Sequence, residues 1–392
     1  MQRFCYRLSA RVLFGAALAI SVASAQAGQP VNGAELGAVY TGEVLYNQRG
    51  GIATGADYLD NLDLTLALNA DQLWSWTGAS FFVYVLYNNG ATFTDRHVGN
   101  AQVVSNIETV RSTRLFELWY EQQFISWDIS SRVGLYNLNA EFYATPSSAI
   151  FINASHGIGP DFSQSGEAGP SIFPNTSLAL RLQQSVNDQL TWRAAVLDAV
   201  PGDPDHPART VVELRGDEGL LAVAELDFHP GNYRLGWGGW RYSKRQTRID
   251  EQGDAISWGS YGFAEVALIG DSLDNAIVSG FVRGGVAERS VNRFENFIGA
   301  GITVEGAFWN CPQHSLGFAF ARAQNGAPYR DIQMLQGVAT QAEETDFEIA
   351  YQFPVGRYLE LKPDLQYVIN PNTDPNLKNA LVIGLRAQLS LY

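Results

Sequence analysis

The chain has 392 residues, of which 46% are hydrophobic and 17% charged, and its formal net charge is −14. Two cysteines and the lack of a basic cluster argue against a disulfide-stabilised scaffold and against a nucleic-acid partner. Beyond the N-terminal region no run of eighteen apolar residues occurs, so a chain that crosses a membrane must do so as a closed β-barrel.

The first 25 residues have the organisation of a signal peptide. Three arginines precede an apolar run from Val12 to Ala23, and Ala23-Ser24-Ala25 has the small-x-small pattern of a cleavage site. Cleavage after Ala27 fits almost as well. We therefore predict that residues 1–25 are a signal peptide and that the protein is exported. Loss of the three arginines takes the formal charge from −14 to −17 and leaves Cys311 as the remaining cysteine.

The N-terminal half of the mature chain is predicted to form amphipathic strands. In residues 61–69, leucines alternate with polar side chains, as expected for a strand between hydrocarbon and water. Residues 91–112 are polar and irregular, and are long enough for an external or an inward-folded loop. In residues 113–124 the alternation predicts one face with Phe116, Leu118 and Tyr120 and the other with Glu117, Trp119 and Glu121.

A long irregular segment follows the strand predicted at 129–138, whose polar face carries Arg132 and Tyr136. Residues 141–176 are rich in Ser, Gly, Pro and Phe and show no sustained alternation. A stretch of about thirty-five residues without regular structure is unusual inside a compact domain and is typical of a functional loop. We expect this segment to contain short ordered pieces and to fold into the lumen of a barrel.

Strand patterns then continue to the C-terminus. Arg181 and Arg193 lie on the polar faces of the next two predicted strands. In the final strand, apolar residues alternate from Leu381 to Leu391, which predicts the lipid-facing side. Tyr392 falls in the polar phase, so the strand either ends near Leu391 or changes register at a bulge.

The strand candidates number about fourteen to sixteen, and roughly 22 residues per strand, loops included, gives about sixteen. The predicted fold class is all-β: a single-domain transmembrane antiparallel β-barrel spanning residues 26–392. A half-buried sheet of a soluble β protein is the alternative. Tryptophans near predicted strand ends are typical of interfacial girdles: Trp74, Trp76, Trp119, Trp127, Trp192, Trp237, Trp240, Trp258 and Trp309.

Several short motifs are spread over the mature sequence. They include Arg114-Leu115-x-Glu117-Leu118-Trp119, Gly134-Leu135-Tyr136 followed by Glu141-Phe142, and Ala380-Leu381-Val382-x-Gly384-Leu385-Arg386. These motifs resemble the carbohydrate-selective porin family (OprB type) of Gram-negative outer membranes. The resemblance implies a sixteen-stranded barrel that passes monosaccharides by diffusion, with no covalent chemistry and no cofactor. It also implies outer-membrane lipids and the outer-membrane assembly machinery as partners.

A sugar-passing pore needs weak, repeated binding, because the solute must leave as easily as it enters. Arginines offer forked donors and carboxylates accept hydroxyls, while aromatic planes take the C–H face of a sugar ring. The candidates for such a constriction are Arg132, Arg181, Arg193, Glu117 and Glu121, with Trp119 and Tyr136 as stacking surfaces. The alternative for each charged residue is cross-strand pairing, and for each aromatic residue a place in the girdle.

Other functions remain open on sequence alone. A general or differently selective porin has the same fold, since a fold does not determine the solute. An outer-membrane esterase would use Ser272 of Gly270-Asp271-Ser272-Leu273 with Asp203-x-x-His206, but the order of these motifs is wrong for that family. A plugged structural barrel is a third possibility. The five histidines show no metal-ligand spacing, and the sequence leaves open whether the protein is a monomer or a homotrimer.

Overall fold

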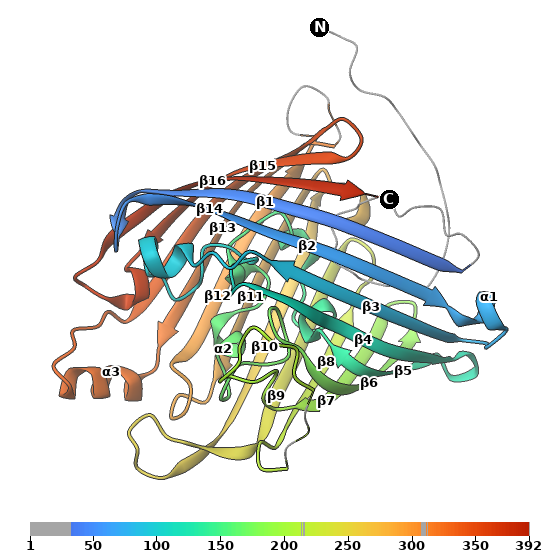
Figure 1. Ribbon diagram of the computed structural model, residues 1–392, viewed down its shortest axis with the longest axis horizontal. Coiled ribbons are helices and arrows are strands. Elements are labelled where there is room, and N and C mark those ends of the chain that lie inside the picture. Colours follow the sequence, from blue (N-terminus) through green and yellow to red (C-terminus); the bar gives the residue numbers. More distant parts are fainter. Residues whose placement is uncertain (1–32, 213, 215, 307–310, 312, 392) are drawn as a thin grey trace, which may run out of the picture.

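The computed structural model describes residues 33–391 except 213, 215, 307–310 and 312. The described residues form one closed antiparallel barrel of sixteen strands, in which β1 pairs with β16 and every other strand pairs with its neighbours along the chain (Figure 1). The predicted all-β barrel of about 16 strands is confirmed. The predicted signal peptide, residues 1–25, and Tyr392 lie outside the described residues. The strands are β1 (Ala34–Gly51), β2 (Gly55–Asn69), β3 (Ala79–Asn88), β4 (Ser112–Phe124), β5 (Ile129–Tyr136), β6 (Ser177–Asn187), β7 (Leu190–Asp198), β8 (Leu220–Phe228), β9 (Tyr233–Thr247), β10 (Asp254–Ile269), β11 (Val278–Ala287), β12 (Phe294–Glu305), β13 (Ser315–Asn325), β14 (Glu343–Val355), β15 (Leu359–Ile369) and β16 (Lys378–Leu391).

Helical segments are short and lie in the connections. They are α1 (Ala70–Trp74), α2 (Pro160–Ser163), α3 (Ala327–Leu335) and single turns at Thr94–Val98, Ile125–Trp127, Leu138–Ala140, Pro146–Ser148, Ala154–His156, Leu273–Asn275 and Pro371–Thr373. Within the part of the chain that the structure describes, no helix has the length and apolarity needed to span a membrane.

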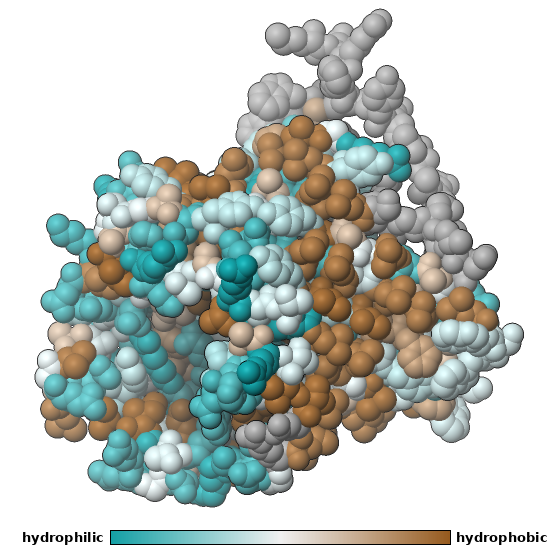
Figure 2. Space-filling model, in the orientation of Figure 1, coloured by the Kyte–Doolittle hydropathy of each residue, from teal (hydrophilic) through white to brown (hydrophobic). Residues whose placement is uncertain are grey.

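The predicted alternation of faces is confirmed along most strands. On β16, Ile383 and Leu385 are 45% and 47% exposed, whereas Arg386 is 8% exposed and faces the lumen. Because successive side chains of a strand point to opposite faces, the outer wall is apolar and the inner wall is polar. Figure 2 shows apolar side chains gathered over the strands, with hydrophilic ones around the end that carries the long loops.

One predicted face is wrong because β4 contains a bulge. Glu117 pairs with Tyr84 and Leu115 pairs with Val85, so Phe116 is an extra residue in β4. Phe116 is 3% exposed, and its ring centre lies 6.3 Å from that of Phe173 in the connection between β5 and β6. A bulge turns consecutive residues to the same side, which a strict period of two does not show.

Two tryptophans assigned to the girdle also lie elsewhere. Trp119 and Trp240 are 6% and 3% exposed and point into the barrel. Trp127 and Trp237, by contrast, are 67% and 64% exposed on the outside. Trp309 lies outside the described residues.

All the long connections leave the same end of the barrel. They follow β3 (residues 89–111), β5 (137–176), β7 (199–219) and β13 (326–342), whereas the opposite end has short turns such as residues 188–189. In bacterial outer-membrane barrels the longer loops are extracellular. We call the first end the loop end and the second the turn end.

The longest connection, residues 137–176, packs inside the barrel. Phe142, Tyr143 and Phe162 form a buried cluster with inward-facing residues of β6 to β10, and Phe162 stacks on Trp240 with ring centres 4.9 Å apart. Each fully buried aromatic side chain contributes about 1.5–3 kcal/mol, so this packing holds the segment against the wall. We call residues 137–176 the inward segment.

A second connection, residues 89–111, packs against the opposite side of the lumen. Phe93, Val98 and Val104 are buried against residues of β1, β2, β15 and β16. The two connections meet where the amide of Asn106 donates to the carbonyl of Ile152 at 2.8 Å. The lumen is therefore narrowed from both sides. The sequence left open whether this connection is external or folded inward, and the structure has it folded inward.

Candidate permeation site

Glu141 ties the start of the inward segment to the barrel wall. Arg181 on β6 donates from Nε and Nη2 to the two carboxylate oxygens of Glu141, each at 2.8 Å. Arg132 on β5 lies 3.4 Å from the same carboxylate, and the hydroxyl of Tyr136 donates to it. Burial alone would raise the pKa of Glu141, but the charges of Arg132 and Arg181 outweigh it and hold the pKa at about 2.

Glu121 on β4 completes this cluster. Its Oε2 accepts from Nε of Arg132 at 2.9 Å and from Nη2 of Arg181 at 2.8 Å. The structure thus brings four candidate residues together, Arg132, Arg181, Glu121 and Tyr136, around Glu141, which was not among the candidates. Arg132 and Arg181 are only 6% and 2% exposed. The signal that could have found Glu141 was its place in the Glu141-Phe142 motif.

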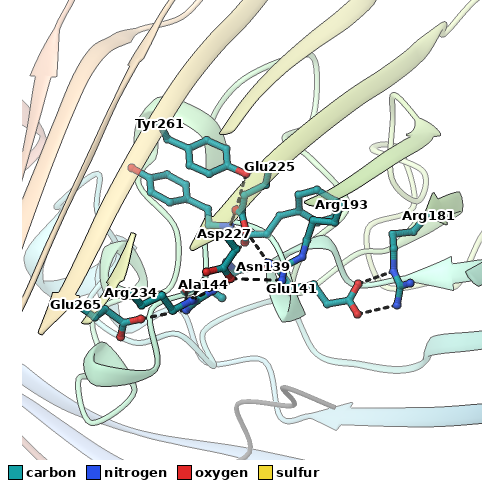
Figure 3. A network of polar contacts seen from close by, with 12 residues as sticks. Asn139, Glu141, Ala144, Arg181, Arg193, Glu225, Asp227, Arg234, Tyr261 and Glu265 are labelled. Atoms are coloured by element: carbon teal, nitrogen blue, oxygen red, sulfur yellow. Dashed lines mark hydrogen bonds and ion pairs between the residues drawn. The ribbon is translucent and has the colours of Figure 1, made fainter. Parts of the chain in front are cut away.

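A second chain of charges runs across β7 to β10 (Figure 3). Arg193 lies 2.6 Å from Glu225 and 3.4 Å from Asp227, and Arg234 links Asp227 at 2.6 Å to Glu265 at 3.0 Å. Arg193 also donates to the carbonyl of Glu141 at 2.6 Å, and Arg234 donates to the carbonyl of Ala144 at 2.9 Å. The candidate Arg193 therefore connects the wall to the same inward segment.

Carboxylates of the wall also accept backbone amides of the inward segment. Glu225 accepts from Tyr143 at 2.7 Å, and Glu265 accepts from Ser147 at 2.8 Å. On β11, Arg283 is a donor where these carboxylates are acceptors. It donates to the carbonyl of Tyr143 at 2.7 Å. Buried backbone groups are costly when unpaired, so these side chains fix the path of the segment.

Trp119 and Glu117 lie beside the first cluster. The indole is stacked on Phe82, with ring centres 5.1 Å apart, and the guanidinium of Arg132 lies 3.8 Å from its ring centre. Its Nε1 donates to Glu117 at 3.1 Å. Both faces of the indole are therefore covered, and a sugar ring would need one neighbour to move. Tyr136 is 1% exposed.

The residues of the esterase alternative are not assembled. Ser272 lies between β10 and β11 at the turn end, whereas Asp203 and His206 lie between β7 and β8 at the loop end. The length of the barrel separates them. Within the described ranges, no group of three His, Cys, Asp or Glu side chains is placed to hold a metal ion.

Residues 53–391 match the model of the family described as carbohydrate-selective porin, OprB family. The chain belongs to this family. It is 24% identical over 400 residues to Porin B of Pseudomonas aeruginosa, a match that covers 89% of this chain and 86% of that protein. The high-pH structure of Pseudomonas putida OprB shares 18% identity and superposes with a TM-score of 0.79, covering 92% of this chain and 94% of that one. A mutant porin of Rh. blastica shares 9% identity, with a TM-score of 0.56 over 91% of this chain and all of that one.

Family and architecture together define the class of protein. The chain is a sugar-preferring outer-membrane porin, a β-barrel channel through which small solutes permeate. Porins are channels rather than enzymes.

Proposed function

We propose that monosaccharides such as glucose diffuse through a constriction built where the inward segment meets β4 to β7. What supports the proposal is the arrangement of arginines and carboxylates at this point, fixed by Glu141. The proposed constriction residues are Arg132, Arg181, Arg193, Glu117, Glu121, Trp119 and Tyr136.

The pairing of these charges fits weak sugar binding. An arginine that already donates to a carboxylate gains little from a sugar hydroxyl, so a hydroxyl replaces water without a strong net attraction. The side chains of Glu141 and Arg193 are 14% and 11% exposed. Their exposed atoms offer a hydrogen-bond acceptor and a donor to the solute. A sugar can therefore exchange hydrogen bonds along the wall and leave as readily as it enters.

The combined replacement of Arg132, Arg181 and Glu117 by alanine tests this lining. Recordings in planar bilayers should show altered ion conductance, and liposome swelling should show altered glucose permeation. The matched control is the replacement of Arg322 and Glu343, an exposed pair 3.5 Å apart on the outer face. If the triple variant permeates glucose and conducts ions like the wild type, the choice of lining residues is wrong.

The range of solutes needs its own measurement. The alternative is a general or differently selective porin, since the fold does not determine the solute. The acidic mature chain favours cations over anions if its charges face the lumen. Swelling of proteoliposomes in glucose, amino acids and organic acids separates the two. Faster entry of glucose than of amino acids of similar size supports sugar preference, and equal rates support the general porin.

Export and assembly complete the proposal. We infer that residues 1–25 are removed as a signal peptide and that residues 26–392 are inserted by the outer-membrane assembly machinery. N-terminal sequencing of protein from outer membranes distinguishes cleavage after Ala25 from cleavage after Ala27. Native gel migration and light scattering separate a monomer from a homotrimer.

A further inference from the structure

A basic groove lies on the outer wall at the loop end of β9 and β10. It has a volume of about 360 Å³, and its lining includes Arg241, Arg245, Arg248, Ile256, Trp258 and Glu288. We call it the rim groove. It is separate from the permeation site, which lies inside the barrel.

The phase of β9 directs two of these arginines outward. Leu235 and Trp237 are 46% and 64% exposed on the lipid-facing side. Arg241 and Arg245 follow in the same phase and are exposed, and Arg241 lies directly opposite Trp258 on β10. Along one face of one strand, the outer surface therefore changes from apolar to basic as it approaches the loop end.

The charges of the rim groove are only partly balanced. Arg248 forms an ion pair with Asp250 at 2.9 Å, and Arg245 donates to the carbonyl of Asp254. The guanidinium of Arg241 has no hydrogen bond or ion pair among the residues that the structure describes, and its backbone pairs within the sheet. Glu288 is the single carboxylate in the lining, and its Oε1 accepts from the amide of Ser290 at 3.1 Å. The lining thus holds three guanidinium groups and one carboxylate.

The surroundings of the rim groove fit a lipid. Trp258 and Val286, 46% and 47% exposed, lie on the same outer face. Arginine is costly at the middle of a bilayer and is tolerated at its surface, which places Arg241 at headgroup level. Guanidinium forks match the oxygen geometry of phosphate groups, and basic pockets at the membrane surface bind anionic headgroups.

We propose that the rim groove binds the phosphate of an anionic lipid headgroup in the outer leaflet. Arg241 and Arg245 hold the phosphate, and the acyl chains lie along Trp258 and Val286. A lipid is favoured over a free anion because the groove opens on the lipid-facing wall and apolar side chains continue from it.

Native mass spectrometry of the full-length folded porin in a neutral detergent tests this site, with diphosphorylated lipid A as the probe. The double variant R241Q/R245Q should retain on the order of ten-fold less lipid than the wild type, since it loses two charge-assisted contacts. The variant E288Q should retain more lipid, because it removes the opposing charge. The matched control is R322Q, at another exposed arginine on the outer wall, which should retain lipid like the wild type.

Two further arms identify the ligand. Fully dephosphorylated lipid A should bind the wild type weakly, and inorganic phosphate should not displace the diphosphorylated lipid. Equal retention by the wild type and R241Q/R245Q, or equal retention of both lipids, would overturn the proposal. Displacement by millimolar inorganic phosphate would also overturn it in favour of a free-anion site. Single-variant R241Q and the circular dichroism of each variant show that any loss does not come from unfolding.

Discussion

Glu141 and Arg181 form a two-point ion pair between the inward segment and β6, with both N–O distances at 2.8 Å. Arg181 is 2% exposed, and it also bonds Glu121. A single guanidinium therefore joins a loop carboxylate to a wall carboxylate. This pair sets the position of the segment more firmly than the apolar contacts alone, because a bidentate ion pair fixes direction as well as distance.

Replacement of Arg181 by alanine should release the start of the inward segment without opening the barrel. Removal of one partner of a buried pair costs about 3–5 kcal/mol, and Arg132 offsets part of it because it also faces Glu141. We expect larger and noisier single-channel currents than in the wild type. Arg181→Lys keeps the charge but loses the forked guanidinium. Its single-channel currents should be intermediate between those of the wild type and those of Arg181→Ala. Currents of wild-type size and noise in both variants would contradict the role of the pair.

The ion pair of Glu141 predicts a pH dependence. Its pKa is held at about 2, below the ordinary value of 4.5, so the ionised form stabilises the segment. This contribution is fully present above about pH 4.5 and is lost as the pH falls through about 2. Between these values the thermal stability of the wild type should fall more steeply than that of E141Q, which lacks the titrating group. If the melting temperatures of the wild type and of E141Q fell by the same amount between pH 7 and pH 2, Glu141 would not titrate in this way.

Gly317 on β13 tests the packing of the inward segment. A methyl group at this position would lie 2.7 Å from the ring of Phe151 and 2.8 Å from Ile150. Gly317→Ala should therefore displace this part of the segment at a cost of about 1–3 kcal/mol and change the conductance. The control is Gly262→Ala, where the nearest atom is 3.5 Å away. The expectation fails if the two variants conduct alike.

Trp119 tests the aromatic part of the permeation site. Trp119→Ala removes the plane between Phe82 and Arg132 and should cost about 3–5 kcal/mol of stability. We expect slower glucose entry in liposome swelling together with a higher potassium chloride conductance. The space widens, while the aromatic plane that a sugar ring reaches when Phe82 or Arg132 moves aside is lost. Trp119→Phe should keep most of the glucose rate. A parallel rise of both rates in Trp119→Ala would indicate a role in steric narrowing alone.

The sequence predicted the parts of the fold that depend on local geometry. The leucines of residues 62–68 and 381–391 alternate because each strand separates lipid from lumen, so their faces could be read directly. The face of Phe116 was missed because a bulge depends on the partner strand β3. The inward packing of residues 89–111 depends on Leu45 and Val382, which are distant in sequence.

The permeation site was predictable only in part. Arg132, Arg181 and Glu121 were found because charged residues on inward strand positions follow the period of two. Their partner Glu141 lies in a segment without periodicity, so the sequence does not predict which way its side chain points. The order of the motifs argues against the esterase pairing of Ser272 and His206. The topology gives the physical reason, since the two residues lie at opposite ends of the barrel.

The ladder between β1 and β16 has a consequence for the timing of assembly. It joins Glu43 to Arg386, which lie 343 positions apart and form an ion pair at 2.9 Å on the inner face. The other fifteen ladders join strands that follow one another along the chain. Fifteen hairpins can therefore form as the chain is delivered, yet until the last of them arrives the sheet has two free edges. The barrel can then close only in a single late step, after β16 has been delivered and can pair with β1.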